Sequence, residues 1–235
     1  MKIVNQLKIL DRGEGWLCVE KPWSMSVHNE PGKDLISILA ADPGLALPDK
    51  SLDKKLLQPV HRLDKETSGL LLLATTPESL TRLSSLFAQG KVHKKYMALV
   101  HGSFDPGKEV KGIWDTTLAK EAGGRKYPRG RGKKIRAITE FTVLEQTPHY
   151  ALVEINLLTG RKHQIRRHAK LAGHPIVGDQ RYGSPRAIQF LRENRGFHRM
   201  GLHAFNLEFT DGTTPVSISC DRLPREMATL LKEDK

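Results

Sequence analysis

The sequence predicts an α+β fold, and three observations support this class. Short apolar runs bounded by glycine, proline or acidic residues are typical of strands. Two pairs of such runs surround short turn-forming segments and therefore indicate hairpins. Between them lie a few segments with the periodicity of an amphipathic helix. We expect a single domain over residues 1–235, because a chain of this length can bury a sizeable core and no internal repeat or boundary is evident.

The first half of the chain predicts a short strand, two helices and a buried strand. Residues 17–19 form a strand that stops at a proline, and residues 35–41 form a short helix before an Asp-Pro-Gly break. The continuous apolar run at residues 70–74 indicates the buried strand. A longer helix follows over residues 76–90, with an N-cap hydroxyl, a proline in its first position and a terminal glycine.

The second half predicts a strand, two hairpins and two further helices. Their ranges are 95–102 for the strand, 138–145 with 151–158 and 202–209 with 216–220 for the hairpins, and about 161–172 and 224–232 for the helices. Arginines and a lysine crowd the first turns of the helix at 161–172. Cations there oppose the helix dipole, so we expect a phosphate or a carboxylate beside them.

The charge of the chain is unevenly distributed. A net charge of +12 and a pI near 9.8 make a polyanion the first partner to consider. Residues 120–136, called the basic segment below, hold eight basic residues and one acid, and so supply +7 of the +12. Clustered cations favour phosphate contacts because they release counterions, although the four glycines leave a solvated linker as the alternative. We expect RNA contact here and along the arginine-rich residues 184–200.

Cellular location is constrained by what the sequence lacks. Cys18 and Cys220 are the only cysteines, too few for a disulfide framework and without metal-ligand spacing. No apolar stretch approaches the length of a membrane span, and the first residues lack the apolar core of a signal peptide. We therefore expect a soluble protein of the cytoplasm. Without an apolar association stripe, a monomer is the expected state.

The segment from His61 to Gly69 is the leading candidate for chemistry. It is polar and charged, it ends in Thr-Ser-Gly, and it stands directly before the apolar run at residues 70–74. Such a pattern indicates an active-site loop that delivers a carboxylate to the start of a buried strand, which makes Asp64 the first catalytic candidate. The alternative is that Asp64 caps a turn and pairs with Arg62.

Three blocks of the chain resemble the RluA-type pseudouridine synthases. The first is HRLDKETSGLLLLA at residues 61–74, the second is KKYMALVHG at 94–102, and the third is TGRKHQIRRH at 159–168 with GHPIVGD at 173–179. The family usually has Asn-Lys-Pro-x-Gly where this chain has Glu20, Trp23 and Ser24, so a framework turn departs from the pattern. The resemblance implies a bent, mixed but mainly antiparallel sheet with flanking helices and a central catalytic cleft.

The resemblance also implies roles for individual residues. Asp64 is the essential catalytic residue, and Tyr96 faces the target base. Arg166 is the cation that holds the Asp64 carboxylate charged, with a phosphate contact as the alternative. The activity implied is the isomerisation of uridine to pseudouridine on a base flipped out of RNA, which needs no redox or electron-sink cofactor and no metal.

The remaining basic candidates are expected to bind RNA. They are Arg62, Lys94, Arg161, Lys162 and Arg167, together with Arg125, Lys126, Arg129 and Arg131 of the basic segment. A stem-loop is the expected target, because unpaired loops release a base at little cost. Members of the family act on transfer RNA, ribosomal RNA or both. The third block and the short N-terminus favour transfer RNA, with 23S ribosomal RNA as the alternative, and we expect no accessory S4 domain.

Two other classes of protein compete with this interpretation. A non-catalytic RNA-binding or ribosome-assembly protein would use the same basic surface but would leave the Asp64, Tyr96 and Arg166 blocks unexplained together. A metal hydrolase would use the histidines at positions 163, 168, 174 and 203. His163 and His168 are five residues apart, so a helix does not place them on one face, and arginines lie between them.

Overall fold

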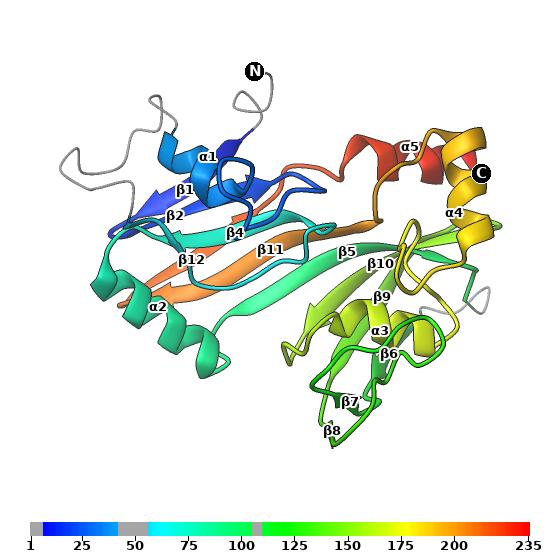
Figure 1. Cartoon of the computed structure of the whole chain (residues 1–235), viewed down its shortest axis with the longest axis horizontal. Coiled ribbons are helices and arrows are strands. Elements are labelled where there is room, and N and C mark those ends of the chain that lie inside the picture. Colours follow the sequence, from blue (N-terminus) through cyan, green and yellow to red (C-terminus); the bar gives the residue numbers. More distant parts are fainter. Residues whose placement is uncertain (1–6, 42–55, 105–109) are drawn as a thin grey trace. The chain divides into compact units, whose positions relative to one another are not determined.

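The computed structural model describes residues 7–41, 56–104 and 110–235, and it contains both helices and strands (Figure 1). Residue contacts divide the chain into two compact units. The first unit comprises residues 1–93 and 204–221, and the second comprises residues 94–203 and 222–235. The predicted α+β class is confirmed, while the single domain stays a prediction.

In the first unit, a mainly antiparallel sheet surrounds one fully buried strand. Its strands lie in the order β1 (Lys8–Gly13), β2 (Trp16–Lys21), β4 (Ser68–Ala74), β11 (Leu202–Asp211) and β12 (Thr214–Ser219), with β3 (Gln58–Pro59) also paired to β4. All seven residues of β4 are buried. A continuous apolar strand suits this central position, whereas the half-exposed β1, which the sequence did not predict, suits an edge.

Two helices belong to the first unit. The first, α1 (Leu35–Ala41), occupies the predicted range. The second, α2 (Pro77–Ala88), packs against β4 and buries Leu83. Its start is a capping box, in which Thr76 Oγ1 accepts from the Ser79 backbone N–H over 3.1 Å while Ser79 Oγ accepts from the Thr76 N–H over 3.2 Å. The predicted cap at Thr76 is therefore confirmed.

The second unit is built on a four-stranded antiparallel sheet. Its order is β5 (His93–His101), β10 (Tyr150–Leu157), β9 (Thr139–Gln146) and β6 (Lys111–Trp114), and a separate pair is formed by β7 (Leu118–Ala119) and β8 (Lys134–Ile135). The predicted strand at 95–102 and the predicted hairpin at 138–158 are confirmed. The β7–β8 pair was not predicted, and of its two strands only β8 lies within residues 120–136.

Three helices complete the second unit, namely α3 (Gln164–Leu171), α4 (Pro185–Arg195) and α5 (Arg225–Glu233). α3 packs against β9, and α5 packs against β10. α4 was predicted only as an arginine-rich stretch, because Leu191 is its one buried residue and its apolar periodicity is weak. Its signals were a Ser-Pro start and a left-handed glycine, Gly196, at its end.

The start of α3 corrects the sequence prediction. The helix begins at Gln164, three residues later than expected, after His163 in a left-handed conformation with φ 53°. The reason is the Gln164 side chain, whose Oε1 accepts from the Thr159 hydroxyl over 2.7 Å and from the Arg161 N–H over 3.0 Å. These bonds hold the preceding residues in a loop. Arg161 and Lys162 therefore precede the helix rather than forming its first turn.

Candidate active site

Asp64 lies in the loop between β3 and β4, and its side chain is half-buried. The loop turns where the Thr67 N–H donates to the Asp64 carbonyl over 3.0 Å. Leu63 and Thr67 are buried on either side of it. The loop runs directly into β4, so a carboxylate does stand just before a buried strand, as the sequence predicts.

His61, near the start of this loop, connects it to two neighbouring elements. The Leu72 N–H of β4 donates to His61 Nε2 over 3.0 Å. The imidazole also stacks on Phe87 of α2, with ring centroids 4.7 Å apart and planes inclined by 18°. Because Nε2 accepts a hydrogen bond, the ring is neutral and carries its proton on Nδ1. His61 thus acts as a brace for the loop.

Lys21 is a buried cation that binds the backbone of the same loop. Its side chain is 0% exposed, and Nζ donates to the carbonyl oxygens of Pro22, Met25 and Lys65 at 2.9, 2.8 and 3.1 Å. The bond to Lys65 fixes the residue next to Asp64. This role was not predicted, although a lysine at the end of an apolar strand and directly before a proline is a usable signal.

Gly69 explains why the loop ends in Thr-Ser-Gly. Its φ is +110°, which side chains rarely adopt, and a Cβ placed there would lie 2.1 Å from the Ala204 carbonyl oxygen of β11. Both residues belong to the first unit. Only glycine lets the start of β4 approach the backbone of β11 this closely. This close approach fixes the position of the chain where the Asp64 loop enters β4.

Tyr96 lies on β5 of the second unit, opposite Ile155 of β10, and is 7% exposed. A buried tyrosine fits both a core position and a wall for a bound base. Its role therefore stays a prediction. Lys94, two residues earlier, is half-buried, and this burial lowers the pKa of its ammonium group. A lysine in that setting gains from a phosphate close by.

Arg166 of α3 forms a buried, two-pronged ion pair within the second unit. Its Nε lies 2.7 Å from Asp179 Oδ2, and its Nη2 lies 2.9 Å from Asp179 Oδ1. The two side chains are 3% and 0% exposed. Parallel bonds of this kind fix the plane of the guanidinium as well as its position. Asp179 was the last residue of the third sequence block, and its role as the anchor of Arg166 was not predicted.

Asp179 also organises the turn that follows it. Its Oδ1 accepts from the backbone N–H groups of Arg181 and Tyr182 at 2.9 and 3.0 Å. The Arg166 guanidinium lies over the Tyr182 ring, 5.4 Å from its centroid, and the Tyr182 hydroxyl lies 3.0 Å from His163 Nδ1. Burial raises the pKa of Tyr182, so its hydroxyl stays protonated. Arg166 is therefore framed by fixed groups.

Arg167, the next residue, corrects a prediction. It was expected to hold a phosphate, yet it is 0% exposed. Its guanidinium makes five hydrogen bonds, to the carbonyl oxygens of Ala119, Pro128, Arg129 and Lys162. These bonds use all five N–H donors of the group. Arg167 therefore acts as a clamp on the backbone of the basic segment, and a direct phosphate contact does not fit its position.

The other predicted RNA-binding residues lie at the surface. Arg62 in the first unit is exposed, and so are Arg161, Lys162, Arg125, Lys126, Arg129 and Arg131 in the second. The basic segment that carries four of them is a folded loop. It contains β8 and turns at Gly124 and Tyr127, and Arg167 binds its backbone at Pro128 and Arg129. Its arginines are presented from a defined backbone, which does not fit the solvated linker considered above.

The histidines considered as metal ligands have other partners. His168 Nδ1 lies 2.9 Å from the Thr139 hydroxyl, and its Nε2 donates to the Thr116 carbonyl over 2.9 Å. Burial lowers the pKa of His168, which keeps it neutral. His174 stacks on Phe104 with centroids 3.9 Å apart. Both serve packing and hydrogen bonding.

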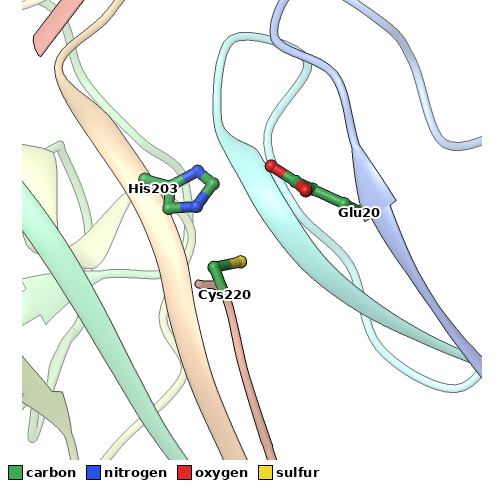
Figure 2. A group of neighbouring side chains, drawn as sticks. All are labelled: Glu20, His203 and Cys220. Carbon is green, nitrogen blue, oxygen red and sulfur yellow. The ribbon is translucent and has the colours of Figure 1, made fainter. Parts of the chain in front are cut away.

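A different trio of potential ligands is drawn in Figure 2. Glu20 and Cys220 belong to the first unit, and His203 is the boundary residue of the second. Burial lowers the pKa of His203 to about 3 and raises that of Cys220 to about 12. A thiol must lose its proton to bind a metal, so the raised pKa of Cys220 disfavours metal binding.

Comparison with known proteins identifies the family. Residues 15–171 match the model of a family described as RNA pseudouridylate synthase. The chain belongs to this family. Among the described residues, no helix is long and apolar enough to cross a membrane.

Curated relatives carry names that cover two kinds of RNA. The tRNA pseudouridine synthase C of Haemophilus ducreyi is 33% identical, over 93% of this chain and 91% of that protein. The ribosomal large subunit pseudouridine synthase C of Vibrio vulnificus is 34% identical, over 84% of this chain but 59% of its own length. The ribosomal large subunit pseudouridine synthase D of Zymomonas mobilis is 32% identical, over 96% of this chain and 72% of that protein. The predicted RluA-type membership is confirmed.

Solved structures support the same assignment. Human RNA pseudouridylate synthase domain containing 1 is 27% identical and superposes with a TM-score of 0.75 over 97% of this chain and 89% of that one. Human RNA pseudouridylate synthase domain containing 4 is 26% identical and superposes with a TM-score of 0.73, over 95% of this chain and 91% of that one. The fold class of the family, a mixed sheet with flanking helices, is thus shared by this chain.

Proposed function

We propose that this chain converts specific uridines in RNA to pseudouridine, with Asp64 as the catalytic carboxylate. Family membership supports the reaction, and the braced loop before β4 supports the choice of residue. The reaction breaks the bond between N1 of uracil and C1′ of ribose, turns the base, and joins C5 to C1′. The C5 proton leaves and N1 gains one, so the atoms balance without an oxidant.

Asp64 has two possible roles near the sugar. Its carboxylate can attack C1′ as a nucleophile, or it can remove a proton from the sugar to give a glycal-like species. Both roles require an ionised and oriented side chain. The bond from Lys21 to the Lys65 carbonyl and the bond between His61 and β4 support this orientation.

Arg166 is proposed to keep Asp64 charged. Asp179 binds the edge of the guanidinium formed by Nε and Nη2, which fixes the orientation of Arg166. A nearby cation favours the ionised form of a carboxyl group that would otherwise be disfavoured by burial. Asp179 would act as a positioning residue, because it touches Arg166 and not the substrate.

The target uridine has to leave its stack to reach a side chain on a loop. We propose Tyr96 as the surface that receives the uracil, and Arg62 as the group that fills the vacated space or binds the displaced backbone. Lys94, Arg161 and Lys162 would bind phosphates, together with the arginines of the basic segment. A hairpin loop of RNA suits this demand, since its bases are already partly unstacked.

Transfer RNA is the proposed target, with 23S ribosomal RNA as the alternative. The relative from Haemophilus ducreyi, which this chain matches over nearly its full length, is named for transfer RNA. The ribosomal relative from Vibrio vulnificus extends well beyond the matched part. A monomer acting in the cytoplasm completes the proposal.

Nucleotide-resolution mapping of pseudouridine tests the proposal. Total RNA would be compared from cells with the intact gene, without it, and with Asp64→Asn. One or more sites should be present only with the intact gene, and their identity would name the substrate. Thermal unfolding of the purified Asp64→Asn protein is the control for folding. If purified wild-type protein also modifies none of the transcripts prepared from these RNAs, the chain is a non-catalytic RNA-binding protein.

A further inference from the structure

A hollow of about 440 Å³ lies in the second unit, beside α4. This volume falls within the ~300–1,000 Å³ typical of small-molecule sites. One face of the helix lines it through Pro185, Ile188, Gln189 and Arg192, at the spacing expected for neighbours on a helix. Arg125 of the basic segment also lines it. The hollow therefore adjoins the segment proposed to bind RNA. The function proposed above gives this hollow no role.

Arg125 is held in place by backbone carbonyls. Its Nη2 donates to the Gln180 carbonyl over 3.1 Å, and its Nε donates to the carbonyl of Gly183. In return, Arg181 donates to the carbonyls of Gly123 and Ala122, each over 3.0 Å. These reciprocal bonds tie the basic segment to the turn before α4. A guanidinium fixed in this way faces its ligand with little rotamer entropy left to lose.

The chemistry of the hollow suits one unpaired nucleotide. Arg125 and Arg192 can bind phosphate, and Pro185 with Ile188 offers an apolar surface for the flat face of a base. Glu193, which also lines the hollow, accepts a hydrogen bond from Gln189 Nε2 over 3.0 Å. A carboxylate repels phosphate but accepts from an exocyclic amino group, so it favours adenine or cytosine over uracil.

We propose that this α4 hollow binds a nucleotide with an amino-bearing base in the RNA substrate, at a distance along the chain from the modified uridine. The proposal rests on the proposed function for the presence of RNA, and it adds a determinant of which RNA is accepted. A nucleotide in this hollow would continue the path of the basic segment, because Arg125 belongs to both. An acidic protein partner is the competing occupant, and Glu193 disfavours it.

The test uses the full chain and labelled 15-nucleotide homopolymers of adenylate and uridylate. Arg192→Gln should weaken binding of the adenylate oligomer roughly tenfold and reduce the salt slope by about one. Arg186→Gln is the matched control, since it removes the same charge from the same helix outside the hollow. It should change affinity less than about twofold. Equal effects of the two variants would overturn the site.

Base preference is the second measurement. Glu193→Ala should reduce the ratio of the adenylate to the uridylate affinity by roughly fivefold, while binding of uridylate in the Asp64 site is common to both proteins. An unchanged ratio would remove the base contact and with it the proposal. These binding results do not depend on catalysis. Pseudouridine formed by a chain whose hollow variants bind normally would defeat the hollow alone, whereas altered binding without pseudouridine would defeat the proposed function alone.

Discussion

The Asp64 loop and the basic segment are both held by a buried cation that binds backbone carbonyls. Lys21 binds the carbonyl of Lys65 in the first, and Arg167 binds the carbonyls of Pro128 and Arg129 in the second. The loops differ in their own side chains. Residues around Asp64 are largely packed, while those of the basic segment face solvent. A catalytic carboxylate has to be held in one position relative to its substrate. Long basic side chains that bind a phosphate backbone can adjust their conformation and still bind.

The largest expected effect comes from glycine substitutions in the two loops. Gly69→Ala places a Cβ 2.1 Å from a backbone oxygen at φ +110°, and should destabilise the protein by about 3 kcal/mol or more while abolishing activity. Gly132→Ala, at φ +86° with nothing within 4 Å, should cost only about 1 kcal/mol. Urea unfolding measures both. Similar losses would show that the two loops are equally constrained.

Replacing the first cation should separate position from binding. Lys21→Met keeps the side-chain length but leaves buried carbonyls without a donor, at a cost of about 2–3 kcal/mol. We expect kcat to fall by at least about tenfold, because the Asp64 loop loses its tie at Lys65, while KM changes little. Steady-state kinetics on the identified RNA gives both values. A variant with normal kcat and raised KM would contradict this division of roles.

Replacing the second cation should give the opposite pattern. Arg167→Met releases the backbone of the basic segment, so RNA affinity should fall roughly five- to tenfold. The single-turnover rate at saturating RNA should stay within about threefold of wild type, since Arg166 keeps its partner Asp179. Affinity is measured by titration of labelled RNA. A large fall in the single-turnover rate at saturating RNA, with unchanged RNA affinity, would show that Arg167 supports catalysis and not RNA binding.

The smallest effect is expected for a single exposed arginine of the basic segment. Arg131 lies over the Tyr127 ring, 5.7 Å from its centroid, and both are exposed. Arg131→Gln should weaken RNA binding by about two- to fivefold and lower the salt slope by about one, with no change in stability. The dependence of affinity on salt concentration measures this. An unchanged slope would exclude Arg131 from phosphate contact.

The sequence predicted most elements because their signals were local. The apolar run of β4, the cap at Thr76 and the hairpins each depend on a few neighbouring residues. The carbonyl bonds of Lys21 and Arg167 join residues that are up to 48 positions apart, and no local pattern reports them. In a sequence, an arginine that binds RNA looks the same as an arginine buried against backbone carbonyls. Arg167 was assigned to phosphate for this reason.

The start of α3 and the role of Asp179 were missed for a related reason. A helix start was placed at about Arg161, directly after Thr159-Gly160, but the side chain of Gln164 holds the preceding residues in a loop. Asp179 follows a glycine and resembles a turn residue. Its value as the anchor of Arg166 depends on a tertiary approach between α3 and the loop after it.

The Arg167 clamp has an evolutionary consequence. It grips the main-chain oxygens of Ala119, Pro128 and Arg129, and these oxygens are present whatever the side chains are. Mutations can therefore exchange the exposed side chains of the basic segment without loosening its backbone. A lineage could acquire a new RNA target by such exchanges while α3 and the Asp64 loop keep the same chemistry.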